Sequence, residues 1–254
     1  MSDPVLVAEA GGVGRITLNR PEVMNAISVE LGEALDGALA DLGARARVIV
    51  IRGAGGNFCV GGDFRQLERL CADGGDAVAP LFDNFRRACA RIREIPVPVV
   101  AAVEGYAMAG GFELMQASDI AVVAAEAKLA DNHSNFGQVP GGGGSQQLPR
   151  LVGRQRALGH LLTGDRLTGA DAVAWGLAYR AVPAAELESV VDGLAAKLAA
   201  KHPDALRRIK RLVLDGLDLP LERGIALERD TVLEHLREDA SREGIDAFTT
   251  RRAS

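Results

Sequence analysis

The segment Val99–Leu114, VVAAVEGYAMAGGFEL, carries the most informative structural signals of this chain. It opens within the apolar run Val97–Val103, which has Pro98 near its start and is typical of a strand buried on both faces. The pair Gly110-Gly111 follows, and the residues from Phe112 to Ala117 predict a helix. A helix that begins directly after glycine presents free backbone N–H groups at the positive end of its dipole. The stretch therefore predicts a strand–glycine–helix junction suited to hold an oxygen atom that carries negative charge.

A second glycine pair follows another predicted strand. Gly61-Gly62 comes after the β-branched run Val48–Ile51, which also predicts a buried strand. If N–H groups from the two junctions converge on one carbonyl oxygen, they form an oxyanion hole. The alternative is that these glycines only permit tight turns. No glycine cluster has the Gly-Lys-Ser/Thr ending of a phosphate loop or the dinucleotide-binding spacing, so nucleotide binding of those two kinds is not indicated.

Strands and helices alternate along most of the chain. Further strands are predicted over Val5–Ala8, Arg15–Leu18 and Ile120–Ala124, with helices over Ser28–Leu42 and most of 64–95. This alternation continues to about residue 183 and predicts an α/β fold with parallel strand pairing. Only helical, charge-balanced segments follow. We expect an α/β core over residues 1–195 and a helical C-terminal section over residues 196–254.

The composition and the N-terminal sequence indicate which partners and which cellular compartment to expect for this protein. The 254 residues include 30 glycines, and 29 basic against 34 acidic residues give a formal net charge of −5. This balance argues against nucleic acid or an anionic membrane as the main partner. The N-terminal residues lack the basic and apolar regions of a signal peptide, and no apolar run is long enough to span a bilayer. We therefore expect a cytoplasmic protein.

Cysteine and histidine spacings predict neither a disulfide framework nor a metal site. The three cysteines form no Cys-x-x-Cys pair, and the four histidines show no metal-ligand spacing. Structural roles are expected for three of the histidines: His160, His202 and His235.

Several motifs, in order along the chain, resemble those of the crotonase, or enoyl-CoA hydratase/isomerase, superfamily. The segment Phe58–Phe64, FCVGGDF, is similar to its first oxyanion-hole motif, and Val99–Leu114 resembles its second. Asn19-Arg20-Pro21 with Asn25-Ala26 is similar to its CoA-binding turn. Later landmarks also match: Phe136-Gly137, Pro140 to Gln146, Leu151 to Gly153 and Leu162 to Gly164.

The resemblance implies a spiral of ββα units closed by C-terminal helices. It implies an acyl-CoA thioester as substrate, with CoA as part of that substrate and no separate cofactor. It also implies a homotrimer or a dimer of trimers. The N–H groups of Gly62 and Gly110 would form the oxyanion hole. The implied CoA-binding residues are Val23, Met24, Ala26, Gly61, Asp63 and Phe248.

Two residues are the candidate catalytic groups. Glu113 matches one of the two catalytic glutamates of family hydratases, although an acid in a first helical turn also complements the helix dipole. His133 occupies the position of the second glutamate. A histidine can act there as base or acid, with Asp131 or Asn132 to orient its ring, or it can be a structural loop residue.

The resemblance favours enoyl-CoA hydration with Glu113 as acid/base. Two other reactions stay open, because the second glutamate is absent. Isomerisation of the double bond needs only one residue that shuttles a proton, and an acyl-CoA hydrolase could use His133 with Asp131. A non-catalytic acyl-CoA-binding protein is the alternative from another functional class.

Overall fold

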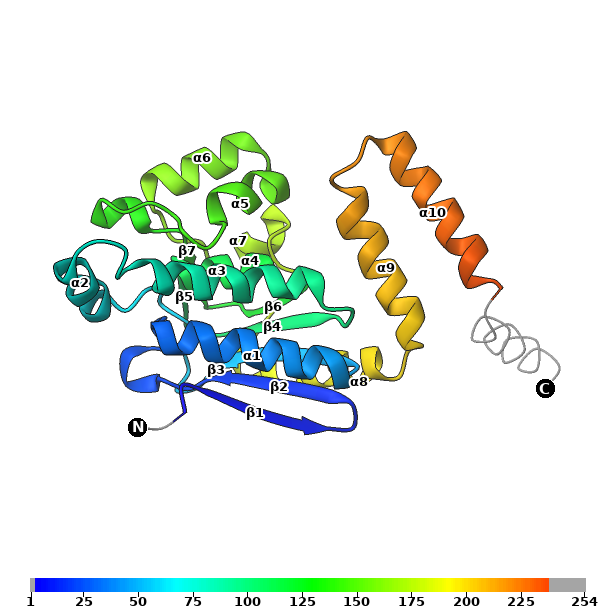
Figure 1. Cartoon of the computed structure of the whole chain (residues 1–254), viewed down its shortest axis with the longest axis horizontal. Helices are drawn as coiled ribbons and strands as arrows, with labels where there is room; N and C mark the ends of the chain where they lie inside the picture. The colour runs from blue at the N-terminus through cyan, green and yellow to red at the C-terminus, as the bar shows by residue number, and fades with distance from the viewer. Residues whose placement is uncertain (1–2, 238–254) are drawn as a thin grey trace. The chain divides into compact units, whose positions relative to one another are not determined.

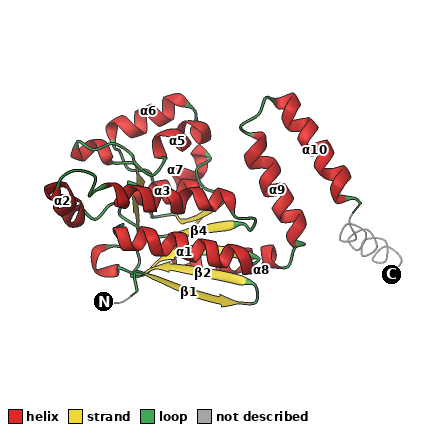
Figure 2. Cartoon of the chain, viewed as in Figure 1, coloured by secondary structure: helices red, strands yellow, loops and turns green. Residues whose placement is uncertain are grey.

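The computed structural model describes residues 3–237 (Figure 1). The chain divides into two compact units, residues 1–198 and 199–254, which are described separately. Most of the helices and all the strands described belong to the first unit (Figure 2).

The main sheet has six strands in the order β1-β2-β3-β4-β6-β8. These are β1 (Val5–Ala10), β2 (Val13–Leu18), β3 (Val48–Gly53), β4 (Val99–Val103), β6 (Ile120–Ala124) and β8 (Arg180–Val182). The first two form an antiparallel hairpin, and each later neighbouring pair is parallel. The strand predicted over Val97–Val103 forms as β4, which begins two residues later and is buried along its whole length. The predicted α/β class with largely parallel pairing is confirmed.

Two long helices, α1 (Val29–Arg45) and α3 (Ala79–Glu94), lie side by side over this sheet (Figure 1). Ser28 begins α1, because its hydroxyl accepts a hydrogen bond from the N–H of Leu31 at 3.1 Å. Between the helices, Asp36 pairs with Arg91 at 2.6 Å. This packing fixes the face of α3 that borders the site described below.

A small two-stranded sheet brings the two glycine pairs together. It consists of β5 (Tyr106–Met108) and β7 (Lys128–Ala130), which were not predicted because each has only three residues. Cys59 lies beside β5: its N–H donates to the carbonyl of Tyr106 at 3.0 Å, and its own carbonyl accepts from Met108 N–H at 2.9 Å. Helix α4 (Gly110–Ala117) begins directly after β5. The Gly61-Gly62 segment therefore lies next to the start of α4.

The other elements of the first unit are short helices and α8. They are η1 (Pro21–Val23), α2 (Phe64–Asp73), η2 (His133–Phe136), α5 (Gly144–Val152), α6 (Arg154–Thr163), α7 (Gly169–Trp175) and α8 (Ala184–Ala199). Within the stretch 64–95, which was expected to be mostly helical, Gly74 and Gly75 lie between α2 and α3.

The second unit contains α9 (Pro203–Gly216) and α10 (Leu221–His235), which pack on each other.

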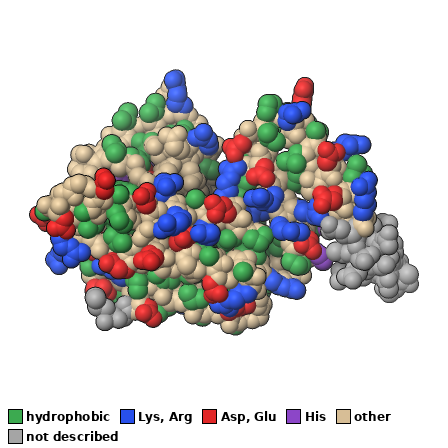
Figure 3. Space-filling model, viewed as in Figure 1, with side chains coloured by type: hydrophobic (Ala, Val, Ile, Leu, Met, Phe, Trp, Pro, Cys, Tyr) green, Lys and Arg blue, Asp and Glu red, His purple; other side chains and the backbone are tan. Residues whose placement is uncertain are grey.

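Basic and acidic side chains are interspersed on the visible face of the first unit (Figure 3). Within residues 3–237, no helix is long and apolar enough to cross a membrane.

Candidate functional site

A cavity of about 870 Å³ in the first unit contains most of the residues expected at the site. Eight of them line it: the two candidate catalytic residues Glu113 and His133, the two glycines Gly62 and Gly110, and Val23, Met24, Ala26 and Asp63. Residues distant in the sequence thus border one space.

The backbone N–H groups of Gly62 and Gly110 lie at adjacent turns. A Cβ placed on Gly61 would be 3.2 Å from the N of Gly110, so the two segments nearly touch. Among residues 3–237, no protein group accepts a hydrogen bond from either N–H. Gly110 is also the first residue of α4, where the helix dipole is positive. Two unpaired N–H groups beside one cavity have the donor chemistry of an oxyanion hole.

Close packing explains why glycine occupies these turns. A Cβ on Gly111 would lie 2.1 Å from the carbonyl oxygen of Cys59, and a Cβ on Gly61 would lie 2.7 Å from the Cβ of Ala109. Ala109 itself has a φ of 47°, which is unfavourable for a residue with a side chain. Gly61 does not line the cavity. It packs beneath the turn that presents Gly110.

Glu113 lies in the first turn of α4, and its side chain is held by the loop before α5. Its Oε1 accepts hydrogen bonds from the N–H groups of Gly142 and Gly144, each at 2.8 Å. The residue is only 2% exposed. Burial raises the pKa of Glu113 and outweighs the opposing effects of the Gly144 N–H and of His133. A carboxyl group with a raised pKa is suited to give and take protons near neutral pH.

His133 begins η2, and Asp131 holds its ring. Nδ1 of His133 lies 2.5 Å from Oδ1 of Asp131, whose side chain is only 1% exposed. Burial alone would lower the pKa of His133, but the hydrogen bond to Asp131 and the negative charges of Asp131 and Glu113 raise it overall. With Nδ1 occupied, Nε2 is the nitrogen left for other partners.

Asp131 and Glu113 are neighbours across Gly144. A Cβ at Gly144 would lie 2.7 Å from Oδ2 of Asp131 and 3.0 Å from Cγ of Glu113. Oδ2 is buried and has no hydrogen-bond partner in the described part of the chain. Three ionisable groups, Glu113, Asp131 and His133, therefore form one cluster, and the glycine at position 144 leaves room for it.

His160 supports this cluster from behind, a role that the sequence did not reveal. Its Nε2 accepts a hydrogen bond from the backbone N–H of Asp131 at 3.0 Å, so this nitrogen carries no proton. Burial lowers the pKa of His160 and so favours the neutral ring. The ring packs against Phe112 and Trp175. The structural role expected for His160 is thus a support for Asp131.

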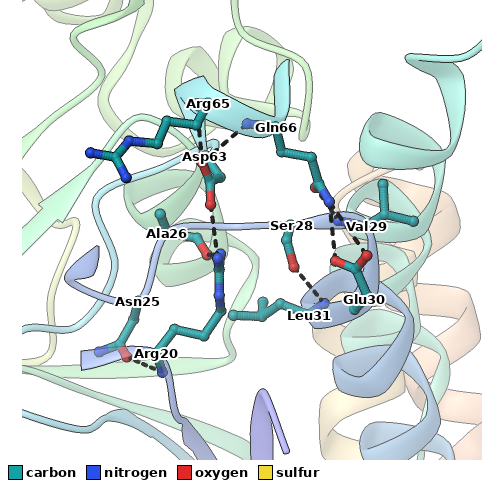
Figure 4. A network of polar contacts seen from close by, with 10 residues as sticks. All are labelled: Arg20, Asn25, Ala26, Ser28, Val29, Glu30, Leu31, Asp63, Arg65 and Gln66. Carbon is teal, nitrogen blue, oxygen red and sulfur yellow. Dashed lines mark hydrogen bonds and ion pairs between the residues drawn. The ribbon is translucent and has the colours of Figure 1, made fainter. Parts of the chain in front are cut away.

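The turn that resembles a CoA-binding segment is tied to the oxyanion segment by Arg20 (Figure 4). The guanidinium of Arg20 donates to the carbonyl of Ala26 at 2.6 Å and to Oδ2 of Asp63 at 2.8 Å. Asp63 in turn caps α2 by accepting from the N–H groups of Arg65 and Gln66. Ile27 completes the link, because its N–H donates to Gly61 at 2.7 Å.

Asn25 explains the unusual backbone of this turn. Met24 and Asn25 both have positive φ values, 51° and 59°. The Asn25 side chain is fully buried, accepts from Arg20 N–H and donates to the carbonyls of Ala54 and Asn57. These bonds hold the turn so that Val23, Met24 and Ala26 line the cavity.

Two further expectations concern metals and the C-terminus. Within the part of the chain that the structure describes, no group of three or more His, Cys, Asp or Glu side chains is placed to hold a metal ion. Phe248 lies outside the described residues.

Comparison with known proteins identifies the family. The family model for enoyl-CoA hydratase/isomerase matches residues 8–254. The enoyl-CoA isomerase/hydratase fer4 of Mycosarcoma maydis is 30% identical, over 98% of this chain and 94% of its own. A solved enoyl-CoA hydratase from Polaromonas sp. JS666 has a TM-score of 0.94 at 32% identity and covers 97% of both chains.

A second solved structure, the enoyl-CoA hydratase from Bacillus anthracis, has a TM-score of 0.92 at 31% identity and covers 98% of this chain and 96% of its own. These likenesses extend over nearly the whole chain, and they confirm the fold predicted from the motifs. The chain belongs to the enoyl-CoA hydratase/isomerase family within the crotonase superfamily, and it is an enzyme that acts on acyl-CoA.

Proposed function

We propose that this enzyme hydrates 2-enoyl-CoA thioesters, with Glu113 as the principal acid/base group. One observation carries the proposal: Glu113 and His133 line the same cavity as the two unpaired N–H groups of Gly62 and Gly110. Acid/base groups and oxyanion donors must face one space for an enolate to form and be protonated.

The N–H groups of Gly62 and Gly110 hold the thioester oxygen in this proposal. Negative charge develops on that oxygen when a nucleophile adds to the β carbon, and two preorganised donors stabilise it. Loss of one such donor costs about 3–4 kcal/mol of transition-state stabilisation. The thioester carbonyl therefore lies at the start of α4, within reach of its dipole.

Glu113 and His133 move the protons. The oxygen of water bonds to the β carbon, one of the two groups takes a proton from that water, and a proton is given to the α carbon. Oε1 of Glu113 is fixed by two backbone donors, which leaves Oε2 for the proton. His133 replaces a second carboxylate, and Asp131 directs its Nε2.

The turn with Val23, Met24 and Ala26 binds the pantetheine and adenine parts of CoA, together with the backbone near Gly61 and Asp63. Its position on the cavity wall and its ties through Arg20 support this assignment. Phe248 is proposed as a further CoA contact.

Hydration of a series of 2-enoyl-CoA esters tests the proposal. We expect turnover by the wild type and a loss of about a hundredfold or more in Glu113→Gln and His133→Ala. Glu126→Gln, at a turn outside the cavity lining, is the matched control. Background rates with every 2-enoyl-CoA, together with turnover of a 3-enoyl-CoA, would establish isomerisation instead. Full activity in Glu113→Gln would remove Glu113 from the mechanism.

Hydrolysis of an acyl-CoA is the second candidate reaction. The contact between Asp131 and His133 favours hydrolysis, because an imidazole that is hydrogen-bonded to a carboxylate can activate water for attack on the thioester carbonyl. Release of free CoA thiol, followed with a thiol reagent, distinguishes hydrolysis from hydration. Binding of acyl-CoA without any product would instead indicate a non-catalytic protein.

We propose a homotrimer as the assembly, with residues 196–254 as its contact section. Apolar side chains support this: Ile209 and Val213 on α9 and Ile225 on α10 are exposed in the second unit. The mass in solution, measured by light scattering, tests it. A mass equal to that of one chain at micromolar concentration contradicts the proposed trimer. A mass six times that of one chain indicates a dimer of trimers.

A further inference from the structure

Phenylalanine is concentrated at the cavity. The chain has seven phenylalanines, and four of them line this space: Phe64, Phe82, Phe85 and Phe136. Two others, Phe58 and Phe112, are fully buried in the core. In a chain with 4% aromatic residues, this gathering gives one cavity a large aromatic surface.

The aromatic surface begins at the reacting groups. Phe85 is 5% exposed and borders both the oxyanion turn and the loop that holds Glu113. A Cβ on Gly142 would lie 2.5 Å from the Phe85 ring, and one on Gly110 would lie 3.4 Å from it. With the thioester held as in the proposed function, the nearest acyl carbons face this ring.

The surface continues along α3 and across to η2. Phe82 lies one turn before Phe85, and its ring would be 2.7 Å from a Cβ on Gly141. Phe64 at the start of α2 contacts Phe136 of η2, with ring centroids 5.4 Å apart. All the residues that α3 contributes to the lining are apolar: Leu81, Phe82 and Phe85.

Three of these rings remain accessible. Phe64, Phe82 and Phe136 are 56%, 42% and 57% exposed. These rings are in contact with water as long as no apolar group covers them. Burial of apolar surface contributes about 25 cal/mol per Å², so a large apolar group that covers the rings gains binding energy that a small one does not.

We infer that the acyl group of the substrate is large and apolar, either an alkyl chain of about eight carbons or an aryl-bearing group, and that Phe82 with Phe64 and Phe136 selects it. The inference rests on the proposed function for the position of the thioester. It assigns the selection among acyl groups to contacts with aromatic side chains that take no part in the chemical step.

A comparison of crotonyl-CoA, 2-octenoyl-CoA and cinnamoyl-CoA tests the inference. We expect kcat/KM of the wild type to be about tenfold or more higher for one or both larger esters than for crotonyl-CoA. In Phe82→Ala and Phe136→Ala this ratio falls by about tenfold. A preference for 2-octenoyl-CoA identifies the alkyl chain, and a preference for cinnamoyl-CoA identifies the aryl group. Leu158→Ala, a half-exposed apolar residue of α6 outside the cavity lining, is the control and keeps the wild-type ratio.

Equal or higher kcat/KM with crotonyl-CoA overturns the inference, as does an unchanged ratio in both phenylalanine variants. Calorimetry with butyryl-CoA and octanoyl-CoA separates this failure from failure of the proposed reaction. Tighter binding of octanoyl-CoA, lost in Phe82→Ala, supports the selectivity even if no 2-enoyl-CoA is hydrated. Hydration without any dependence on acyl size supports the reaction and contradicts the selectivity.

Discussion

Nδ1 of His133 lies 2.5 Å from Oδ1 of Asp131, and this contact defines which ring nitrogen is left to act. The carboxylate is buried and its second oxygen has no hydrogen-bond partner within residues 3–237. A buried negative charge beside imidazole stabilises the protonated ring and orients it. His133 thus has a buried carboxylate of its own as a partner.

Asp131→Asn should lower the pKa of His133. The variant keeps an oxygen that can accept from Nδ1–H but removes the negative charge that offsets burial. We expect the imidazole to titrate at a lower pH and kcat/KM to fall by about tenfold to a hundredfold. NMR of isotope-labelled histidine measures the titration, with the His133 signal assigned from a His133→Gln spectrum. Asp83→Asn, an exposed residue of α3, is the control. An unchanged titration and rate would show that Asp131 does not act on His133.

Glu113→Gln should remove activity and stabilise the fold at alkaline pH. The folded state binds the Glu113 proton more tightly than the unfolded chain, because burial raises the pKa above 4.5. The stability contribution is therefore complete below the unfolded-state pKa and is lost as pH rises through the folded-state pKa. Glutamine does not ionise, so the variant avoids this loss.

Thermal unfolding of both proteins at pH 5 and pH 8 checks the Glu113 prediction. The melting temperature of Glu113→Gln relative to wild type should be higher at pH 8 than at pH 5. A relative melting temperature that falls between these two pH values would contradict the assignment of a raised pKa to Glu113.

Gly144→Ala should damage the catalytic cluster directly. The added Cβ would lie 2.7 Å from Oδ2 of Asp131 and 3.1 Å from Oε1 of Glu113, so one carboxylate must move. We expect a loss of about tenfold or more in kcat and a destabilisation of about 1–3 kcal/mol. Gly159→Ala is the matched control, because a Cβ on this α6 residue meets no atom within 4 Å. It should keep activity and gain about 0.5–1 kcal/mol. Equal activity in the two variants would contradict the role of Gly144.

The local signals of the sequence predicted the elements that frame the site. The run Val97–Val103 and the Gly110-Gly111 pair predicted β4 and the start of α4, because burial and helix initiation depend on neighbouring residues. The position of Glu113 followed from the same stretch. Its resemblance to known motifs also predicted the family, which the comparisons confirm.

Contacts between distant residues were not predictable in this way. Gly142 and Gly144 belong to the motif Pro140 to Gln146, which indicated only a resemblance, yet their N–H groups bind a carboxylate about thirty positions earlier in the chain. The support of Asp131 by His160 depends on a similar separation. The strands β5 and β7 have three residues each, too few for a clear periodic pattern. These features arise from tertiary packing, which a single sequence does not encode as a local motif.

Ala109→Gly should stabilise the fold while impairing catalysis. Ala109 has a φ of 47° and a ψ of −117°, a conformation that glycine adopts without the steric cost of a Cβ. Relief of about 1–3 kcal/mol of strain exceeds the added backbone entropy of about 0.5–1 kcal/mol in the unfolded chain. The Cβ of Ala109 also packs against Gly61, where it would lie 2.7 Å from a Cβ placed on that glycine. It therefore restricts the position of the neighbouring Gly110 N–H.

A looser turn misplaces that donor, and we expect kcat to fall about tenfold while unfolding shifts to higher denaturant concentration. Ala196→Gly in α8 is the control: an exposed helical alanine carries no such strain, so its replacement should lower stability by about 0.5–1 kcal/mol and leave kcat unchanged. Chemical denaturation and steady-state kinetics of the two variants measure both quantities. A destabilised Ala109→Gly would show that the turn is unstrained, and an undiminished kcat would show that Ala109 does not position Gly110.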